Sequence, residues 1–510
     1  MTAKIKSVTI IGLEAVPIEV EVDIVKGLPG MAIVGLPDKA VEEAKERVKS
    51  AIRNSNAIFP NKKIIVNLAP ADIKKEGPSF DLPIAVGILV ASGQIRFNDE
   101  KQLFLGELSL DGSLRQINGV ITAAIFCQEN KIRELYLPAA NAAEASLISG
   151  FELLPVQTLD QLILHLKDES KIEPQQETLI DDLINNSKTS QFDMKYIAGQ
   201  EQVKRALEIA AAGGHNILLF GSPGSGKTLL ARAFNTILPR MRPEEILEVT
   251  KIYSVAGMLS HTKPLICERP FRSPHHTASS ISVVGGGNWP KPGEISLSHR
   301  GVLFMDEFPE FPRSVLEALR QPLEDGSICI SRAQGSLEFP ARFILIAAQN
   351  PCPCGYLGDE GHECICSPTE IVRYRKRISG PILDRIDIHL EVPRIKYKKM
   401  VSKAKNESSK KVRRRVEAGR RNQILRFHKA GIKTNAEMGI REIKRFCQID
   451  NNCEKLLESA MDSLGLSARG YHRTLKIART IADLAPSKFI KTEHIAEALS
   501  YRPKEQKIFA

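Results

Sequence analysis

Apolar and polar positions along the chain form three blocks that predict separate folded regions. In residues 1–166, short apolar runs such as VTIIGL and KIIVNLAP alternate with segments of helical periodicity such as AVEEAKERVKSAIRNS. Strand and helix patterns alternate again in residues 192–395, and residues 396–510 carry helical patterns throughout. Alternation of this kind is typical of mixed α/β folds. We therefore expect two mixed α/β domains followed by a helical domain.

A polar linker separates the first two blocks. Residues 167–191 are acidic and poor in aromatic side chains, which is typical of a connecting segment. A chain of 510 residues suggests about three domains, and a hydrophobic content of 43% is enough to bury their cores. The sequence has no run of about 18 apolar residues and no basic-then-apolar leader. We expect a cytoplasmic protein that makes no contact with a membrane.

The charge of the chain is unevenly distributed. Its 71 Lys and Arg residues outnumber its 60 Asp and Glu residues, which gives a formal net charge of +11, and residues 396–429 are densely cationic. Such a segment binds polyanions because neutralised phosphates release their condensed counterions. A solvated helix face would have the same composition. The sequence favours neither interpretation over the other.

The strongest motif is a glycine-rich turn between a strand and a helix. The apolar run ILLF at residues 217–220 precedes GSPGSGKT, and a helical pattern follows it. In this context the pattern G-x-x-x-x-G-K-[ST] binds nucleotide phosphates, because backbone N–H groups of the turn surround them. Its lysine reaches the β- and γ-phosphates, and its threonine ligates Mg²⁺. The predicted ATP–Mg²⁺ site consists of Gly221, Ser222, Pro223, Gly224, Ser225, Gly226, Lys227 and Thr228.

A second motif, GVLFMDEFPEF at residues 301–311, supplies two carboxylates. Its four apolar residues predict a buried strand that ends just before Asp306. In-line phosphoryl transfer needs a metal anchor and a group that positions the attacking water. We expect Asp306 to hold Mg²⁺ through water and Glu307 to orient and deprotonate the attacking water.

Two further polar residues follow in an order that suits the same site. The strand-like run ARFILIAAQNP contains Asn350, which we expect between the metal strand and the phosphate loop, close to the γ-phosphate. Arg385 lies in the apolar context LDRID, where an unpaired guanidinium is costly. It either pairs with Asp384 or Asp387, or enters the ATP site of a neighbouring subunit and neutralises transition-state charge there.

This order of motifs resembles the plan of the AAA+ ATPases. The segment that begins FRSPHHTASS and ends ICISRAQG is similar to the magnesium chelatase-like branch, and the chain resembles its YifB/ComM family from end to end. The resemblance implies a multidomain α/β protein with a Lon-protease-like α+β N-terminal domain in residues 1–166. It further implies an AAA+ P-loop core with a parallel sheet in residues 192–395 and a C-terminal helical lid in residues 396–510.

The resemblance also implies a function and its partners. Members of the family are similar to hexameric, ATP-dependent DNA motors that promote homologous recombination by branch migration during natural transformation. Single-stranded and branched DNA, other copies of the chain and recombination proteins are the partners expected on this basis.

The same resemblance assigns family roles to individual residues. They are the Walker A pair Lys227 and Thr228, the Walker B pair Asp306 and Glu307, the sensor 1 residue Asn350, the trans-acting finger Arg385 and the sensor 2 residue Arg469. Arg473, one helical turn further along, is the alternative for the last role.

Two inserts are expected from the resemblance. One lies in the second helix around residues 278–291 and contains Trp289, and the other is a hairpin around residues 327–341. Arg332 in this hairpin stands where related motors place a basic residue that faces DNA in the central pore. The alternative is a solvent-exposed arginine of a turn.

Four of the nine cysteines form a tight cluster. The segment NPCPCGYLGDEGHECICSP contains C-x-C, nine residues and a second C-x-C, and in a cytosolic chain such a cluster indicates metal ligands. We expect Cys352, Cys354, Cys364 and Cys366 to bind a structural Zn²⁺. Replacement of one ligand by His362, or four reduced cysteines in a mobile loop, are the alternatives.

Two adjacent histidines, His275 and His276, also suggest a metal. Adjacent side chains on an extended chain point in opposite directions, so we expect no ion shared between them.

The segment KEGPSFDLPIA at residues 75–85 resembles the turn on which Lon-type serine proteases present their nucleophile, here Ser79. In an alignment through the GEL and INGV segments, the catalytic lysine position falls on Ile121. A serine hydroxyl is a weak nucleophile without an adjacent base. We expect Ser79 to be a turn and helix-cap residue and the domain to serve as a scaffold or substrate platform.

Two other functions fit parts of the sequence. A magnesium chelatase subunit is one, but the D-x-S-x-S metal-adhesion motif is missing from the chain. An ATP-dependent protease or remodelling factor is the other, and the isoleucine at the lysine position disfavours it.

Overall fold

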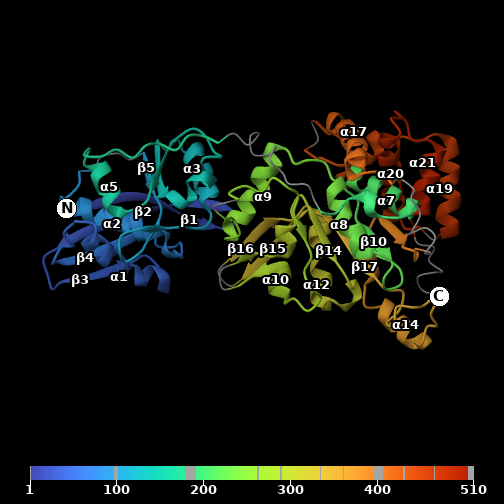
Figure 1. Cartoon of the computed structure of the whole chain (residues 1–510), viewed down its shortest axis with the longest axis horizontal. Helices are drawn as coiled ribbons and strands as arrows, with labels where there is room; N and C mark the ends of the chain where they lie inside the picture. Colours follow the sequence, from blue (N-terminus) through green and yellow to red (C-terminus); the bar gives the residue numbers. More distant parts are fainter. Residues whose placement is uncertain are drawn as a thin grey trace. The chain divides into compact units, whose positions relative to one another are not determined.

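The chain folds into two compact units (Figure 1). The first contains Met1–Ser187 and Pro243–Cys267, and the second contains Lys188–Arg242 and Glu268–Ala510. The computed structural model describes residues 2–96, 101–178, 191–260, 263–287, 290–332, 335–359, 361–395, 406–428, 431–464 and 466–502. Residues 243–267 therefore interrupt the second unit along the chain but pack with the first.

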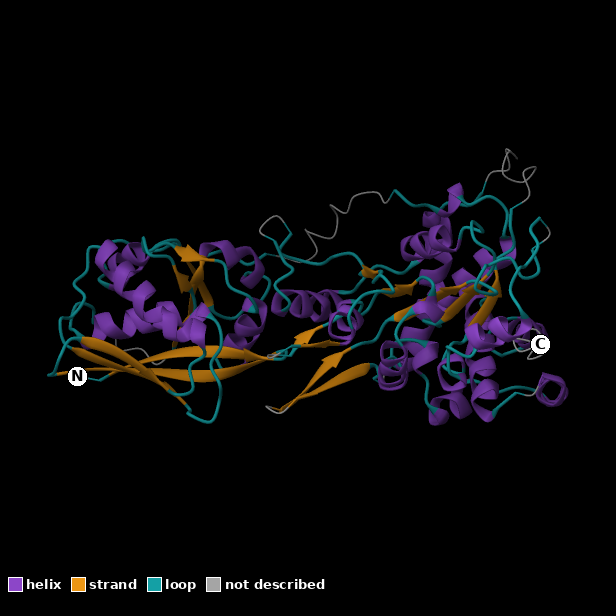
Figure 2. Cartoon of the chain, turned by 90° about the horizontal axis from the view of Figure 1, so that it is seen from below, coloured by secondary structure: helices purple, strands orange, loops and turns teal. Residues whose placement is uncertain are grey.

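The first unit is built on a four-stranded sheet with the order β1-β2-β4-β3. The β1–β2 and β2–β4 pairs are antiparallel, and β3 runs parallel to β4. In Figure 2 the helices of this unit lie on one side of the sheet. The strands are β1 (Ala3–Ile11), β2 (Glu14–Val25), β3 (Gly30–Val34) and β4 (Lys63–Ala69), and the helices that pack on them are α1 (Lys39–Asn54) and α2 (Asp81–Ala91).

The two helices differ in how they meet the core. In α1 the buried residues recur at helical spacing, which leaves the opposite face in water. In α2 the first nine residues are all buried, because the helix lies between the sheet and other elements. Gly87 allows this close approach, since a Cβ at that position would lie 2.6 Å from Cγ2 of Val22.

Smaller elements complete the first unit. A three-stranded parallel sheet has the order β5-β8-β9, and β6 pairs with β7. The bounds are β5 (Gln102–Phe104), β6 (Glu107–Leu108), β7 (Leu114–Arg115), α3 (Val120–Glu129), β8 (Glu134–Pro138), α4 (Ala142–Ala145), β9 (Glu152–Val156) and α5 (Leu159–Leu166). Part of the expected linker also belongs here, because the N–H of Thr178 donates to the carbonyl of Ser146.

Helix α9 (Pro243–Val255) joins the first unit although it follows the phosphate loop in sequence. Its carbonyl at Ser254 accepts a hydrogen bond of 3.2 Å from the N–H of Gly119, and the hydroxyl of Ser254 donates to Glu144. Burial raises the pKa of Glu144. These contacts tie the helix to the residues around α3.

The second unit contains a five-stranded sheet with the order β11-β14-β17-β10-β18, in which every pair is parallel. The carboxyl ends of β10, β14 and β17 therefore lie at one edge, which is where ligands bind in open α/β sheets. The strands are β10 (Ile217–Phe220), β11 (Phe271–Arg272), β14 (Val302–Met305), β17 (Ile344–Gln349) and β18 (Ile388–Glu391). Helices α7 (Glu201–Gly213) and α8 (Lys227–Ile237) bury their apolar faces in the same core.

Both expected inserts are present in the described residues as small elements. The first is α10 (Ser280–Val284) with the two-residue strands β12 (Gly285–Gly286) and β13 (Lys291–Pro292), while Trp289 lies outside the described residues. The second is an antiparallel hairpin of β15 (Ser327–Arg332) and β16 (Gly335–Pro340), which confirms the hairpin predicted before Asn350. The neighbouring helices are α11 (Glu294–Leu297), α12 (Arg313–Ala318), α13 (Arg320–Asp325), α14 (Pro368–Arg375) and α15 (Gly380–Leu383).

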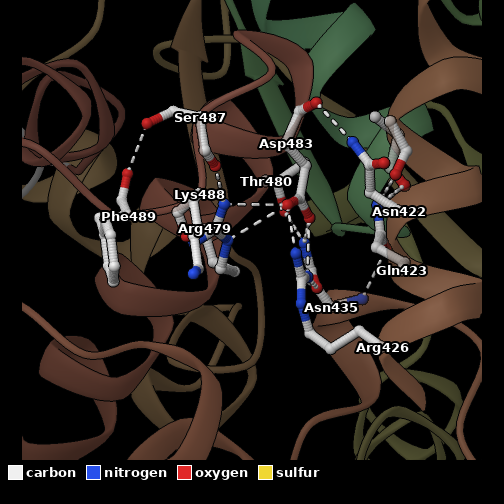
Figure 3. A network of polar contacts seen from close by, with 12 residues as sticks. Asn422, Gln423, Arg426, Asn435, Arg479, Thr480, Asp483, Ser487, Lys488 and Phe489 are labelled. Carbon is white, nitrogen blue, oxygen red and sulfur yellow. Dashed lines mark hydrogen bonds and ion pairs between the residues drawn. The ribbon is translucent and has the colours of Figure 1, made fainter.

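The described part of the C-terminal region is helical, as predicted. Its elements are α17 (Ser409–Phe427), α18 (Ile440–Phe446), α19 (Asn451–Leu464), α20 (Ala468–Leu484) and α21 (Thr492–Ser500). A buried ionic network links α17 and α20 (Figure 3). Asp483 pairs with both Arg426 and Arg479, and it accepts a hydrogen bond of 3.0 Å from the amide of Asn435. The mixed α/β core with its parallel sheet and helical C-terminal region agrees with the predicted fold class.

Among the described residues, no helix combines the length and the apolar character needed to cross a bilayer.

Candidate functional site

The glycine-rich turn lies where the motif predicted it, between β10 and α8 at the carboxyl edge of the sheet. Gly224 and Gly226 have φ values of +75° and +91°, a left-handed backbone that favours glycine. A Cβ on Gly221 would lie 2.4 Å from the carbonyl oxygen of Val392, so this position also requires glycine. The first turn of α8, whose N–H groups have no partner within the helix, faces the loop.

Lys227 opens α8 and folds back over the loop. Its Nζ donates to the carbonyls of Gly221 at 2.7 Å and Ser222 at 3.1 Å, and to Oδ1 of Asn350 at 3.1 Å. The residue is only 8% exposed, and burial lowers the pKa of Lys227 while the charge of Asp306 opposes that shift. The ammonium therefore lies inside the loop, in reach of phosphates that would occupy it.

Thr228 and Asp306 come together across the site. The hydroxyl of Thr228 donates to Oδ2 of Asp306 at 2.9 Å. Asp306 directly follows β14, in which all four residues are buried, so the strand fixes the position of the carboxylate. Hydroxyl and carboxylate oxygens are the hard ligands that Mg²⁺ prefers. The donor set thus fits a magnesium ion bound together with nucleotide phosphates.

Glu307 has a left-handed backbone conformation directly after β14, and its carboxylate contacts a histidine. Its φ of +51° is unusual for a residue with a side chain, and its N–H donates to Oδ1 of Asp306 at 3.0 Å. Oε2 of Glu307 lies 2.9 Å from Nδ1 of His276. His276 and Glu307 are 31 positions apart in the sequence, and no spacing rule links a histidine at one position to a carboxylate at the other.

The histidine pair differs from its prediction. The ring centroids of His275 and His276 are 4.2 Å apart, with the planes tilted by 32°, so the rings lie together and do not point in opposite directions. The backbone is not extended here, because a turn follows β11 at these residues. Among the described residues, the only group of metal-ligating side chains close enough to share an ion is the cysteine cluster.

Arg385 has neither of the two carboxylate partners that the sequence suggested. Its guanidinium pairs with Glu324 and donates to the carbonyl of Pro381 at 2.5 Å, and its side chain is only 7% exposed. Within the described residues its Nε has no hydrogen-bond partner. Glu324 also lies 3.6 Å from Nη2 of Arg469, so the expected finger and the expected sensor 2 arginine share one carboxylate.

Arg473 has a different environment from Arg469. Its Nη1 donates to Oδ1 of Asp387 at 2.9 Å, and both side chains are largely buried. The side chain of Arg469 is 60% exposed. Glu324, which sits on α13 in the segment RQPLEDGS, belongs to no motif, and nothing in the sequence marked it as the meeting point of two arginines.

The residues expected to touch DNA are placed only in part. Arg332 ends strand β15 and pairs with Gly335 across the hairpin. In the basic segment, residues 396–405 lie outside the described residues, and α17 packs one face on the core. Arg415 pairs with Glu208 and Glu407, and Arg426 pairs with Asp483, so part of this charge is balanced within the unit. Lys410, Arg414 and Arg421 are exposed.

The four clustered cysteines lie together just after β17. Their sulfur atoms are all within 4.8 Å of one another, and the four side chains belong to one loop. His362 is not among them; its ring stacks on Tyr356 and its Nδ1 lies 3.0 Å from Nη1 of Arg394. The arrangement therefore offers four sulfur ligands to one ion.

Ser79 lies in a short 3₁₀ turn, Pro78–Phe80, that leads into α2. Its carbonyl accepts a hydrogen bond of 2.9 Å from the N–H of Gly106. In the described part of the chain its hydroxyl has no lysine or histidine partner, and Ile121 is fully buried in α3. A base that could activate the serine is not in place there.

Comparison with known proteins covers nearly the whole chain. Family models described as "Subunit ChlI of Mg-chelatase", "Magnesium chelatase, subunit ChlI" and "Magnesium chelatase, subunit ChlI C-terminal" match residues 20–141, 193–400 and 406–502. The chain is 46% identical over 496 residues to the competence protein ComM of Haemophilus influenzae, which covers 96% of this chain and 95% of that protein. The uncharacterized protein YifB of Escherichia coli matches with the same identity and coverage. The magnesium-chelatase 38 kDa subunit of Cereibacter sphaeroides is 26% identical, over 31% of this chain and 53% of that protein.

Proposed function

The chain belongs to the magnesium chelatase-like family that includes ComM and YifB, and from this membership we propose that it is an AAA+ ATPase that drives movement on DNA. The observation that carries the ATPase part is the convergence of Lys227, Thr228, Asp306 and Asn350 at one edge of a parallel sheet. The near-complete match to a protein named for competence supports the DNA part. A chelatase function is less well supported, because the chelatase subunit of Cereibacter sphaeroides is 26% identical over only 31% of this chain, whereas ComM is 46% identical over 96% of it.

The contacts support a division of labour in ATP hydrolysis. Lys227 would bind the β- and γ-phosphates in place of the carbonyls it now contacts, and Thr228 with Asp306 would hold Mg²⁺. Glu307 would position and deprotonate the attacking water. Asn350, already bonded to Lys227, would contact the γ-phosphate and report whether it is present.

We propose that Arg385 acts as a finger on the nucleotide of a neighbouring subunit in a hexameric ring, and that Arg469 is the sensor 2 residue of the lid. Both guanidinium groups lie at Glu324 and neither contacts the phosphate loop of its own chain in the described residues. Glu324 is a carboxylate, and carboxylates and phosphates are the anions that guanidinium groups bind most strongly. The engagement of Arg473 with Asp387 supports Arg469 as the sensor 2 residue.

DNA is the proposed track of the motor. The hairpin that contains Arg332 belongs to the same unit as the ATP site, which is compatible with a pore loop. The exposed cations of α17 provide a second surface suited to phosphates. We infer that single-stranded and branched DNA are the substrates, that the motor extends strand exchange by branch migration during natural transformation, and that it works beside recombination proteins.

The first unit is proposed to be a Lon-like domain without protease activity. Support comes from the turn at Ser79 and the buried Ile121 at the position where a lysine would be needed. We propose that it acts as a scaffold or a platform for DNA or protein partners.

ATPase measurements with different DNA molecules test the proposal. We expect forked and three-stranded DNA to stimulate ATP hydrolysis by the purified protein, and duplex of equal length to stimulate it less. If ATP hydrolysis is the same with and without each DNA, the DNA part of the proposal is wrong. If there is no hydrolysis under any condition, the ATPase part is wrong as well.

A further inference from the structure

The loop that carries the cysteine cluster is shaped like a metal site. Sγ of Cys352 lies 3.4 Å from Sγ of Cys354 and 3.6 Å from Sγ of Cys364, and the Cys354–Cys364 distance is also 3.6 Å. Four thiolates around a tetrahedral Zn²⁺ with Zn–S bonds of about 2.3 Å would be about 3.8 Å apart. A disulfide would need about 2.05 Å. The observed spacing fits four ligands of one zinc ion.

Backbone groups of the loop are directed at the sulfur atoms. The N–H of Cys354 donates to Sγ of Cys366 at 3.3 Å, and the N–H of Leu357 donates to Sγ of Cys352 at 3.4 Å. Hydrogen bonds of this kind stabilise thiolates and orient them toward a metal. The backbone of the loop therefore orients the sulfur atoms toward one another, as a shared metal ion requires.

The same loop touches the phosphate loop at its tip. Gly355 has a φ of +87°, and a Cβ at this position would lie 2.6 Å from Cγ of Pro223. The backbone of the cysteine loop thus packs directly on the proline of the GSPGSGKT motif. One residue away, the side chain of Ser222 is the largest cause that holds the pKa of Asp359 below its ordinary value.

Asp359 is itself held firmly within the cysteine loop. Its side chain is only 2% exposed, it accepts a hydrogen bond of 2.9 Å from the N–H of Gly361, and it lies 3.4 Å from Nη1 of Arg394. A third connection runs through the chain, because Cys352 follows Asn350 by two residues and Asn350 is bonded to Lys227. The cysteine loop therefore connects with both the phosphate loop and the sensor 1 position.

An ion has a clear physical effect on such a loop. The described residues between Cys352 and Cys366 form no helix and no strand, so backbone ladders do not restrain them. A free segment of this length loses conformational entropy when it is ordered, and that cost opposes the packing on Pro223. Cross-linking by a metal removes the alternative conformations in advance, as it does in small zinc-stabilised folds.

We propose that Cys352, Cys354, Cys364 and Cys366 bind one Zn²⁺, and that the zinc-bound loop holds the phosphate loop in the shape that binds nucleotide. Zinc occupancy then controls nucleotide affinity through the contacts at Pro223 and Ser222. This inference rests on the proposed nucleotide site and adds a metal-dependent element to it.

Zinc content and nucleotide affinity, measured on the same samples, test the proposal. We expect elemental analysis to find about one zinc per chain in the wild-type protein. Zinc is then removed with a strong chelator, the chelator is dialysed away and Mg²⁺ is restored. Binding of a fluorescent ADP analogue should become about tenfold weaker, as expected if the loop keeps its productive shape about a tenth of the time. Addition of Zn²⁺ should restore the affinity.

Three variants separate the metal from the contact it supports. Cys364→Ser with Cys366→Ser should lose zinc and weaken nucleotide binding, while Cys267→Ser, outside the cluster, should change neither. Asp359→Ala should retain zinc but still weaken nucleotide binding, because it removes the contact to Ser222. Circular dichroism checks that each variant is folded. If the cysteine double variant is unfolded, the chelated wild-type protein and the separate Asp359→Ala variant still test the proposal.

Different failures have different meanings. A wild-type protein that holds no zinc after incubation with Zn²⁺ would overturn the metal site. Unchanged ADP affinity after zinc removal and in Asp359→Ala would overturn the coupling to the phosphate loop. Absence of nucleotide binding by the zinc-loaded wild type would instead contradict the proposed nucleotide site itself.

Discussion

Nδ1 of His276 lies 2.9 Å from Oε2 of Glu307, the carboxylate proposed to activate water. His276 follows β11, and Glu307 follows the neighbouring strand β14. His276 also contacts the ring of Phe311 edge-on, which restricts where the imidazole can point. The pair lies next to Asp306 and Thr228. We therefore interpret His276 as a positioning residue for Glu307.

Replacement of His276 tests this relationship. Glu307→Gln should lower kcat by about 10²–10⁴-fold, because it removes the general base. His276→Ala should lower kcat by about 10- to 100-fold, since the base remains but its orientation is lost. The affinity for an ADP analogue should not change in either variant. Steady-state ATP hydrolysis and equilibrium binding measure the two quantities.

His275→Ala is the matched control. His275 lies beside His276, but its Nδ1 contacts the hydroxyl of Thr277 at 2.8 Å and not the carboxylate. We expect nearly normal kcat in this variant. Equal kcat in His276→Ala and in the wild type would show that the histidine does not position Glu307.

Lys227→Ala should abolish nucleotide binding and lower hydrolysis by at least about 100-fold, because the ammonium is the proposed phosphate ligand of the loop. Burial holds the pKa of Lys227 below its ordinary value, and bound phosphates would favour the charged form. The affinity for ADP should therefore fall as the pH rises through this lowered pKa. Isothermal titration across alkaline pH measures the effect, and normal ATP turnover by Lys227→Ala would refute the site.

Arg469 and Arg473 should respond differently to replacement by alanine. Arg469 is exposed, so Arg469→Ala should reduce ATP hydrolysis without lowering Tm. Arg473→Ala should reduce the free energy of unfolding by about 3–5 kcal/mol, because it leaves the buried carboxylate of Asp387 without its main partner. Thermal unfolding and ATPase assays on both variants compare the two roles. If Arg473→Ala has a normal Tm but has lost ATP hydrolysis, Arg473 is the sensor 2 residue and Arg469 is not.

The pH dependence of Arg473→Ala follows from Asp387. Burial would raise the pKa of Asp387, but the charge of Arg473, with His215, outweighs it and leaves the pKa below its ordinary value. A carboxylate of this kind stabilises the fold above its unfolded pKa, and the stabilisation is lost as the pH falls toward its folded pKa. The difference in stability between wild type and Arg473→Ala should be fully present at neutral pH and shrink in acid.

Arg385→Ala should slow hydrolysis by about 10³–10⁵-fold while nucleotide binding remains, as expected for a finger that acts on a neighbouring site. In a ring, subunits that carry this change should also impair their wild-type neighbours. Mixing the two proteins in increasing ratio and measuring ATP hydrolysis detects this effect. A linear decrease that reflects only dilution would argue that Arg385 is a structural partner of Glu324.

The local motifs could be read from the sequence because each one fixes its own surroundings. A strand before GSPGSGKT and a helix after it predict a phosphate-binding loop at the carboxyl end of that strand. Because β10, β14 and β17 are parallel, Asp306 and Asn350 lie at the same end of the sheet. The four cysteines followed from their spacing, and the hairpin around residues 327–341 followed from the family resemblance. These features depend on residues close together in the chain.

The remaining features depend on partners that periodicity does not identify. Helix α9 lies within the segment predicted as the AAA+ core, but only the folded chain shows that it packs with α3 in the first unit. Glu324 lies 61 residues from Arg385, and no motif links them. The turn after β11 brought His275 and His276 together because the backbone there is not extended, which the sequence did not reveal.

Strand exchange on a three-stranded DNA junction tests the central claim most directly. Purified wild-type protein with ATP and Mg²⁺ should convert the junction to exchanged products, and Lys227→Ala should not. Arg332→Ala should lose most of this strand-exchange activity but keep the ATP hydrolysis measured without DNA, because the substitution removes only a proposed contact with DNA. If the wild-type protein hydrolyses ATP but leaves the junction intact, the claim that this chain is a DNA motor is contradicted.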